Sequence, residues 1–234
     1  MALTKVDKSL LETTAGTADA TTFLRGDGTW DAPDSGGFNS VQVFTASGTW
    51  TRPAGITKVV IEVQGAGGGG GVAPTSYPEY TLGGSGGGYA KKFIDVSSVT
   101  ASVVTVGAAG SGSASPTGAP GADGGDSSWV DTASGGSSTV TGVKGVGGYA
   151  SYGIVVGGAA TGGDINMKGG DAGWGGQYGT LAGASILGNA GKNGYVTSGI
   201  STAGSGYGAG GGGRYINTPA SDGAPGIVIV WEYK

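Results

Sequence analysis

The chain has 234 residues, and 56 of them are glycine, about a quarter of the sequence where an average globular protein has about 7%. It contains no cysteine and no histidine, which excludes disulfide bridges, zinc-thiolate centres, thiol nucleophiles and histidine-based catalysis. The formal net charge of −4 argues against nucleic-acid binding, because a protein that binds phosphate backbones needs a basic surface.

Residues 1–37 are polar and end in the breaker sequence Ala32-Pro33-Asp34-Ser35-Gly36-Gly37. Leu3, Val6 and Leu10 share one face at helical spacing, but a helix this short needs partner chains or a docking surface. We therefore expect a separate module with a linker, and a frayed terminus is the alternative. The charges near the N-terminus do not fit a signal peptide, and no apolar run approaches the length of about 18 residues that predicts a membrane span.

The tripeptide Arg25-Gly26-Asp27 resembles a cell-adhesion motif. It lies between two short apolar pieces, however, and Asp27-Gly28 is typical of a tight turn. We therefore interpret it as a turn.

Five stretches are rich in β-branched or aromatic residues and are bounded by glycine, proline or serine. They predict strands near 41–45, 57–64, 89–96, 100–106 and 226–232. Val59, Ile61 and Val63 alternate with polar residues, as in a half-buried strand. We expect a small β-sandwich, or a sheet closed by the C-terminal strand.

Glycine clusters recur through residues 107–226, where regular strand patterns fade, and two earlier clusters interrupt the predicted strands at 65–71 and 83–88. Flexible linkers are one interpretation. Aliphatic and aromatic residues lie between the clusters throughout, however, which is not typical of linkers. The alternative is a polyglycine-II-like bundle of extended helices with three residues per turn, packed through their backbones, with the non-glycine stretches as turns at its ends. The predicted fold is thus mainly β, with a short N-terminal segment followed by residues 38–234 as a combined sandwich and bundle.

No motif supports catalysis or a cofactor. Gly65, Gly67 and Gly70 match a dinucleotide fingerprint, but the following residues contain prolines and cannot begin the helix that the fingerprint requires. Asp123 and Asp126 could suggest calcium, yet most of the acidic residues in this region adjoin glycine, and a structural role in turns fits better. We expect no enzyme, no cofactor and no metal, although paired carboxylates for glycoside cleavage remain an alternative.

The aromatic residues give the candidate binding site. Trp129 and Trp174 are expected to pack over the glycine-rich core. Tyrosines beside the glycine clusters could instead be displayed on polar loops, where rigid rings provide contact area at low entropic cost. These candidates, for which packing is the equal alternative, are Tyr77, Tyr80, Tyr149, Tyr152, Tyr178, Tyr195, Tyr207 and Tyr215.

Three stretches carry a resemblance to bacteriophage tail-fibre and receptor-binding proteins. Residues 21–30 resemble a short element of fibre chains, residues 44–59 with the glycines at 65–70 resemble the start of a glycine-rich tip domain, and residues 224–233 resemble its closing strand. The glycine runs with intervening loops are also similar to the adhesins of T-even-type long tail fibres.

The resemblance implies a virion protein that is made in the host cytoplasm and assembles as a homotrimer. Its N-terminal segment, residues 1–37, would trimerise and attach to a tail or baseplate protein. The tip loops would bind a host surface glycan or outer-membrane protein, without membrane insertion and without nucleic acid. The rival hypothesis is a structural or surface-coating protein, including an ice-binding one, which regularly spaced threonines on one face would favour. The sequence itself shows no such spacing.

Overall fold

A computed structural model of the chain describes residues 22–26, 29–32, 36–73, 81–114, 118–131, 138–149, 153–173, 181–194, 200–214 and 219–234. The chain divides into two compact units, one comprising residues 1–38 with Lys234 and the other residues 39–233. The first unit contains a hairpin of β1 (Phe23–Leu24) and β2 (Trp30–Asp31), in which the Arg25 amide donates to the Thr29 carbonyl at 2.8 Å. The predicted turn residues, Asp27 and Gly28, lie outside the described residues.

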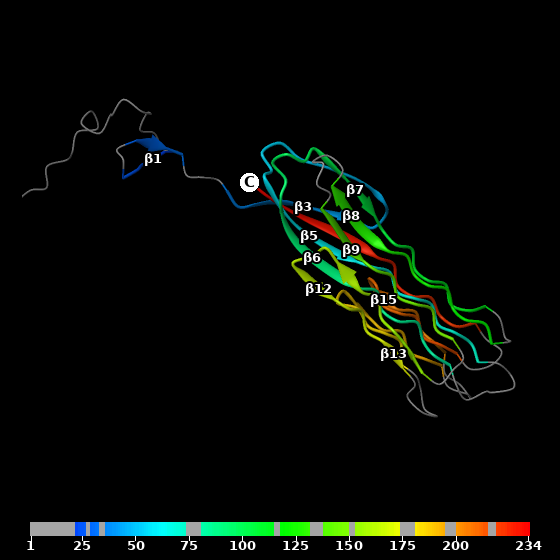
Figure 1. Cartoon of the computed structure of the whole chain (residues 1–234). Coiled ribbons are helices and arrows are strands. Elements are labelled where there is room, and N and C mark those ends of the chain that lie inside the picture. Colours follow the sequence, from blue (N-terminus) through cyan, green and yellow to red (C-terminus); the bar gives the residue numbers. More distant parts are fainter. Residues whose placement is uncertain are drawn as a thin grey trace, which may run out of the picture. The chain divides into compact units, whose positions relative to one another are not determined.

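The second unit begins with two five-stranded antiparallel sheets (Figure 1). The β5 sheet has the order β12-β6-β5-β16-β3, and the β8 sheet has the order β11-β9-β8-β7-β4. The strands of the β5 sheet are β3 (Phe38–Phe44), β5 (Lys58–Gln64), β6 (Tyr89–Asp95), β12 (Ile165–Met167) and β16 (Ile227–Tyr233). Those of the β8 sheet are β4 (Gly48–Thr51), β7 (Ala101–Thr105), β8 (Ser127–Asp131), β9 (Thr139–Gly142) and β11 (Ala160–Thr161). The prediction of a mainly β fold is confirmed.

Alternation of apolar and polar residues builds the sandwich core. Val59, Ile61 and Val63 of β5 are fully buried and face residues of the β8 sheet, while Val60 and Glu62 point to the other side. Trp50 and Trp129 meet in this core with ring centroids 6.3 Å apart. The expectation for Trp129 is corrected here, because the ring packs inside the sandwich and not over the glycine-rich region. Strands β8 and β9 also lie within 107–226, where the sequence predicted that strand patterns fade.

A buried carboxylate fastens the edge strand β3 to this core. Glu232 is 1% exposed and accepts hydrogen bonds from Ser40 Oγ at 2.5 Å, from Gln42 Nε2 at 2.7 Å and from Trp50 Nε1 at 2.8 Å. Hydrogen bonds to a charged acceptor are stronger than neutral ones, so this cluster fixes the position of β3.

The strands continue into a bundle of extended glycine-rich segments. The central segment, 65–73, donates its backbone N–H groups from residues 65–72 to three neighbours in rotation, so that every third N–H bonds the same neighbour. The groups are Gly65, Gly68 and Gly71 to segment 81–88, Ala66, Gly69 and Val72 to segment 118–126, and Gly67 and Gly70 to segment 219–226. Within each group the acceptor number falls by three as the donor number rises by three, so these neighbours run antiparallel to it.

The carbonyls of the central segment accept bonds from three more neighbours. Segments 107–114, 143–149 and 208–214 each donate to it twice, at donors and acceptors three residues apart and in parallel direction. A period of three with six surrounding segments is the geometry of a polyglycine-II bundle. Such a core consists of backbone, and it requires glycine because a Cβ at Gly67 or Gly70 would overlap a neighbouring carbonyl group.

The remaining short pairings lie along the bundle. They are β10 (Ile154–Val155) with β13 (Ala172–Gly173), and β14 (Gly188–Asn189) with β15 (Ser205–Gly206). At the junction with the sandwich, Gln64 donates through Nε2 to the carbonyls of Gly87 at 2.8 Å and Gly88 at 3.1 Å. This side chain ties β5 to the first turns of the bundle.

Candidate functional site

The candidate site is the end of the bundle remote from the sandwich, here called the distal end. The chain leaves the described bundle there at residues 73, 114, 149, 173, 194 and 214, and it returns at 81, 118, 153, 181, 200 and 219. The connecting stretches 74–80, 115–117, 150–152, 174–180, 195–199 and 215–218 lie outside the described residues. Six chain reversals therefore start and finish on one end of one scaffold.

Backbone hydrogen bonds hold the distal end together. The Leu82 amide donates to the Tyr149 carbonyl at 3.1 Å, and the Gly71 amide donates to the Leu82 carbonyl at 3.1 Å. The Arg214 amide donates to the Gly71 carbonyl at 2.8 Å. Because these bonds use main-chain groups, the side chains at this end are free to vary without disturbing the frame.

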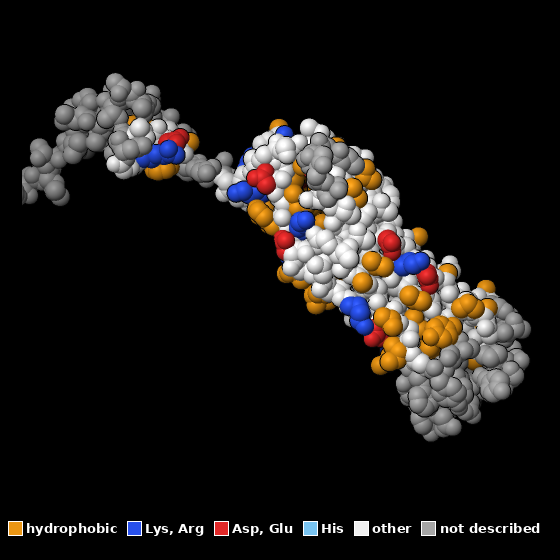
Figure 2. Space-filling view, viewed as in Figure 1, with side chains coloured by type: hydrophobic (Ala, Val, Ile, Leu, Met, Phe, Trp, Pro, Cys, Tyr) orange, Lys and Arg blue, Asp and Glu red, His pale blue; other side chains and the backbone are white. Residues whose placement is uncertain are grey.

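Exposed apolar side chains gather at the distal end. Leu181 is 73% exposed, Ile200 is 77% exposed and Ile154 is 59% exposed. Ile154 and Leu181 are both register partners of Gly173, where an added Cβ would meet no atom within 4 Å. Two aliphatic side chains thus flank a bare piece of backbone, a surface suited to an apolar ring face or side chain. Figure 2 shows hydrophobic side chains on the bundle towards this end, beside pairs of oppositely charged residues.

Two of the eight candidate tyrosines lie within the described residues. Tyr149 is at the distal end and is 39% exposed. Tyr207 is half-buried at the opposite end of the bundle, where its amide donates to Leu187 and its carbonyl accepts from Ser185. The structure therefore does not bring these two residues together. The other candidates, Tyr77, Tyr80, Tyr152, Tyr178, Tyr195 and Tyr215, lie outside the described residues, as does Trp174.

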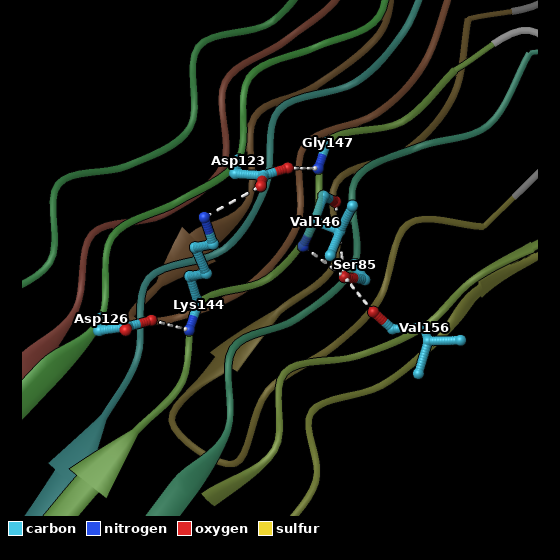
Figure 3. A network of polar contacts seen from close by, with 7 residues as sticks. All are labelled: Ser85, Asp123, Asp126, Lys144, Val146, Gly147 and Val156. Atoms are coloured by element: carbon cyan, nitrogen blue, oxygen red, sulfur yellow. Dashed lines mark hydrogen bonds and ion pairs between the residues drawn. The ribbon is translucent and has the colours of Figure 1, made fainter.

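The acidic residues of the bundle accept backbone N–H groups from neighbouring segments. Asp123 accepts from Gly147 at 2.9 Å and Asp126 accepts from Lys144 at 2.8 Å (Figure 3). Asp171 accepts from Gly157 at 2.7 Å and Asp222 accepts from Gly112 at 2.7 Å. Each satisfies an N–H at the bundle perimeter. The sequence predicted that these aspartates act within turns, and this prediction is corrected. Each aspartate instead bonds sideways, from its own bundle segment to a neighbouring segment. The sequence signal was the recurrent glycine next to each aspartate.

These contacts shift the titration of two carboxylates. The Gly147 amide, followed by the Lys144 ammonium at 3.1 Å, holds the pKa of Asp123 below its ordinary value against the opposing effect of burial. The Gly157 amide and Lys168, at 2.6 Å, lower the pKa of Asp171 in the same way. Both carboxylates are therefore ionised at neutral pH and act as hydrogen-bond acceptors there.

Ser85 joins three segments inside the bundle. Its hydroxyl accepts from the Val146 amide at 2.8 Å and donates to the Val156 carbonyl at 2.9 Å, and its own amide donates to the Val146 carbonyl at 2.9 Å (Figure 3). Ser85 thus adds a side-chain bridge between segments that are otherwise joined by main-chain hydrogen bonds. No local pattern in the sequence distinguishes Ser85 from a serine in a flexible linker.

Among the described residues, no group of three or more Asp or Glu side chains converges as a metal site. Within the same residues, no helix has the length and apolar character needed to cross a membrane. The acidic groups nearest the distal end already serve the scaffold. What the distal end offers is apolar contact area on a rigid frame.

Fold and site together define a glycine-rich β-protein, in which a sandwich holds a backbone-packed bundle with an exposed apolar end. The family model of the glycine-rich domain matches residues 42–233, and the chain belongs to this family. A comparison with curated proteins finds no match.

Proposed function

We propose that the chain is a receptor-binding protein of a bacteriophage tail fibre, and that the distal end of its bundle contacts a glycan or an outer-membrane protein on the host surface. The observation that carries this proposal is the convergence of six chain reversals on one end of a scaffold whose bonds are mostly main-chain. Such a scaffold tolerates exchange of the connecting sequences, as attachment to variable receptors requires.

The exposed side chains support a binding role over a purely structural one. Leu181, Ile200 and Ile154 expose apolar surface at the distal end, where a structural cap would carry polar groups. Tyr149 adds an amphipathic ring to the same end. Each single contact would be weak, and the proposed homotrimer, attached to the tail or baseplate through residues 1–37, would strengthen attachment by avidity.

The test is binding of the labelled full-length chain to a panel of bacterial strains. Leu181→Ser and Ile200→Ser should each lower cell binding at least about fivefold, since each removes exposed contact area at the proposed site. Val103→Ser is the matched control, because Val103 is 46% exposed on the outer face of the β8 sheet. Equal binding by all variants, or loss with Val103→Ser alone, would count against the proposal.

Two treatments of the cells separate the receptor classes. Periodate oxidation destroys glycans, whereas protease digestion removes exposed outer-membrane protein. Loss of binding after one treatment and not the other assigns the receptor. Release of reducing sugar during incubation would instead indicate depolymerase activity.

A surface-coating function, including ice binding, is the second candidate, and one observation favours it. Strand pairing collects threonines on the outer face of the β8 sheet, where Thr105, Ser128, Thr141 and Thr161 are successive register partners. Thr49, Thr51 and Thr139 are exposed on the same face. The threonines are not regularly spaced in the sequence, and strand pairing brings these ones together. A thermal-hysteresis assay of the native chain and of Thr139→Lys separates this function from receptor binding.

A further inference from the structure

The outer face of the β5 sheet is unusually apolar for a sheet surface that faces away from the core. Phe93, Val60 and Trp231 are successive register partners on β6, β5 and β16 and form one row. Val41 and Val43 of the neighbouring strand β3 are 41% and 54% exposed, and Phe93 is 53% exposed. Ile165 and Met167 extend the face onto β12, with exposed fractions of 51% and 43%.

The other side of the same sandwich provides an internal comparison. An antiparallel sheet with one solvated face normally alternates apolar residues inward with polar residues outward. The β8 sheet follows this rule in the row of Thr105, Ser128, Thr141 and Thr161, although Val103 and Val130 lie in the next row of the same face. The β5 sheet departs from it more widely, because each of its five strands turns at least one large apolar side chain outward, so this face has the composition of a surface that another surface covers.

The charges of this face are paired within the chain. Glu62 contacts the Lys91 ammonium at 3.2 Å and accepts hydrogen bonds from Trp231 Nε1 at 3.1 Å and from the Tyr89 hydroxyl at 2.9 Å. Lys58 is the register partner of Asp95, whose carboxylate accepts from the Ser97 amide at 2.9 Å. A face with internally paired charges can pack against other copies of this chain without like-charge repulsion, whereas a charged partner would be matched by unpaired charges.

The size of the face also fits self-association. Five strands about 4.8 Å apart, with up to seven residues rising about 3.4 Å each, give a face of roughly 24 Å by 24 Å, or about 570 Å² before side-chain relief is counted. This approaches the roughly 800 Å² that each partner buries in a standard protein interface.

We infer that the outer face of the β5 sheet is the surface through which copies of this chain pack against one another. The inference rests on the proposed function for the number of copies, three, around a common axis. The Thr-rich face of the β8 sheet then remains on the outside of the assembly.

The experiment is the molecular mass of the purified full-length chain by sedimentation equilibrium over a range of concentrations. Phe93→Glu and Val43→Glu should each raise the dissociation constant of the assembly at least about tenfold, since each places an unpaired charge in an apolar interface. Val103→Glu, on the outer face of the other sheet and 46% exposed, should leave it unchanged. Circular dichroism of each variant verifies that the sandwich is folded.

A second measurement covers the case in which the charged variants do not fold. Because the chain has no cysteine, a single Phe93→Cys or Val103→Cys substitution can carry a pyrene label at one known position. Excimer emission from the label at 93, and none at 103, is expected.

A native trimer that Phe93→Glu leaves intact, or excimer emission at 103 alone, would show that the outer face of the β5 sheet is not the contact surface. The proposed trimer would then still stand. A monomeric native chain would overturn both. Receptor binding remains separately testable, because cell binding of Leu181→Ser does not depend on assembly mass.

Discussion

Replacing Gly69 by alanine tests whether the bundle is held by close-packed backbones. The Gly69 amide donates to the Ala122 carbonyl at 2.9 Å, and its carbonyl accepts from the Gly148 amide at 2.8 Å. A Cβ at Gly69 would overlap the Ser111 carbonyl and lie 2.6 Å from the Gly112 nitrogen, so a neighbouring segment must move.

A displacement that breaks the two hydrogen bonds of Gly69 leaves its buried amide and carbonyl without partners, at a cost of about 1–3 kcal/mol each. Overpacking adds about 1–3 kcal/mol, which gives a loss of about 3–9 kcal/mol from a typical total of about 5–15 kcal/mol. We therefore expect Gly69→Ala to lower the melting temperature by about 6 °C or more, or to prevent folding.

Gly173→Ala is the matched control within the same bundle. An added Cβ at Gly173 meets no atom within 4 Å, so alanine should leave stability unchanged or raise it by up to about 1 kcal/mol through the unfolded state. Differential scanning calorimetry is the appropriate assay, because it detects the unfolding of the sandwich and of the bundle alike. A Gly69→Ala variant within about 1 kcal/mol of Gly173→Ala would refute the close-packing argument.

Three further predictions concern the polar groups. Glu232→Gln should cost about 1.5–3 kcal/mol in denaturant unfolding, because the amide cannot accept from Ser40, Gln42 and Trp50 together, and an unchanged midpoint would show that the cluster is dispensable. Ser85→Ala should cost about 2–3 kcal/mol by leaving the Val146 amide and the Val156 carbonyl without partners, and a loss under about 0.5 kcal/mol would contradict this role. The lowered pKa values of Asp123 and Asp171 mean that their stabilisation is present above the ordinary carboxyl pKa of about 4 and is lost as the pH falls through their folded-state pKa values. The melting temperature should therefore decrease below about pH 4, and Asp123→Asn should make that decrease smaller. An equal decrease in this variant would mean that groups other than Asp123 cause it.

Local sequence patterns predicted the class of fold. The alternation in Val59, Ile61 and Val63 identified a half-buried strand, and the glycine clusters with interleaved apolar residues indicated a packed bundle of extended segments. Both features depend on residues that are close together in the sequence. The period of three in the hydrogen bonds follows from the same local geometry once glycine occupies the contact positions.

The neighbours across strands and segments could not be predicted from the sequence. Thr105, Thr141 and Thr161 lie far apart in the chain, and pairing alone brings them into one row. Strands β8 and β9 are short and are embedded among glycines, which masks their alternation. The opposite placement of Tyr149 and Tyr207 depends on the direction of each segment, which glycine spacing does not specify.

Hydrogen–deuterium exchange of the full-length chain, with and without envelope fractions of a bacterial strain that it binds, tests the central claim most directly. Receptor binding at the distal end predicts slower exchange in peptides that contain Leu82, Tyr149, Leu181 and Arg214, whereas peptides from β7 and β8 should exchange at unchanged rates. Protection confined to the sandwich, with unchanged exchange at the distal end, would contradict the account.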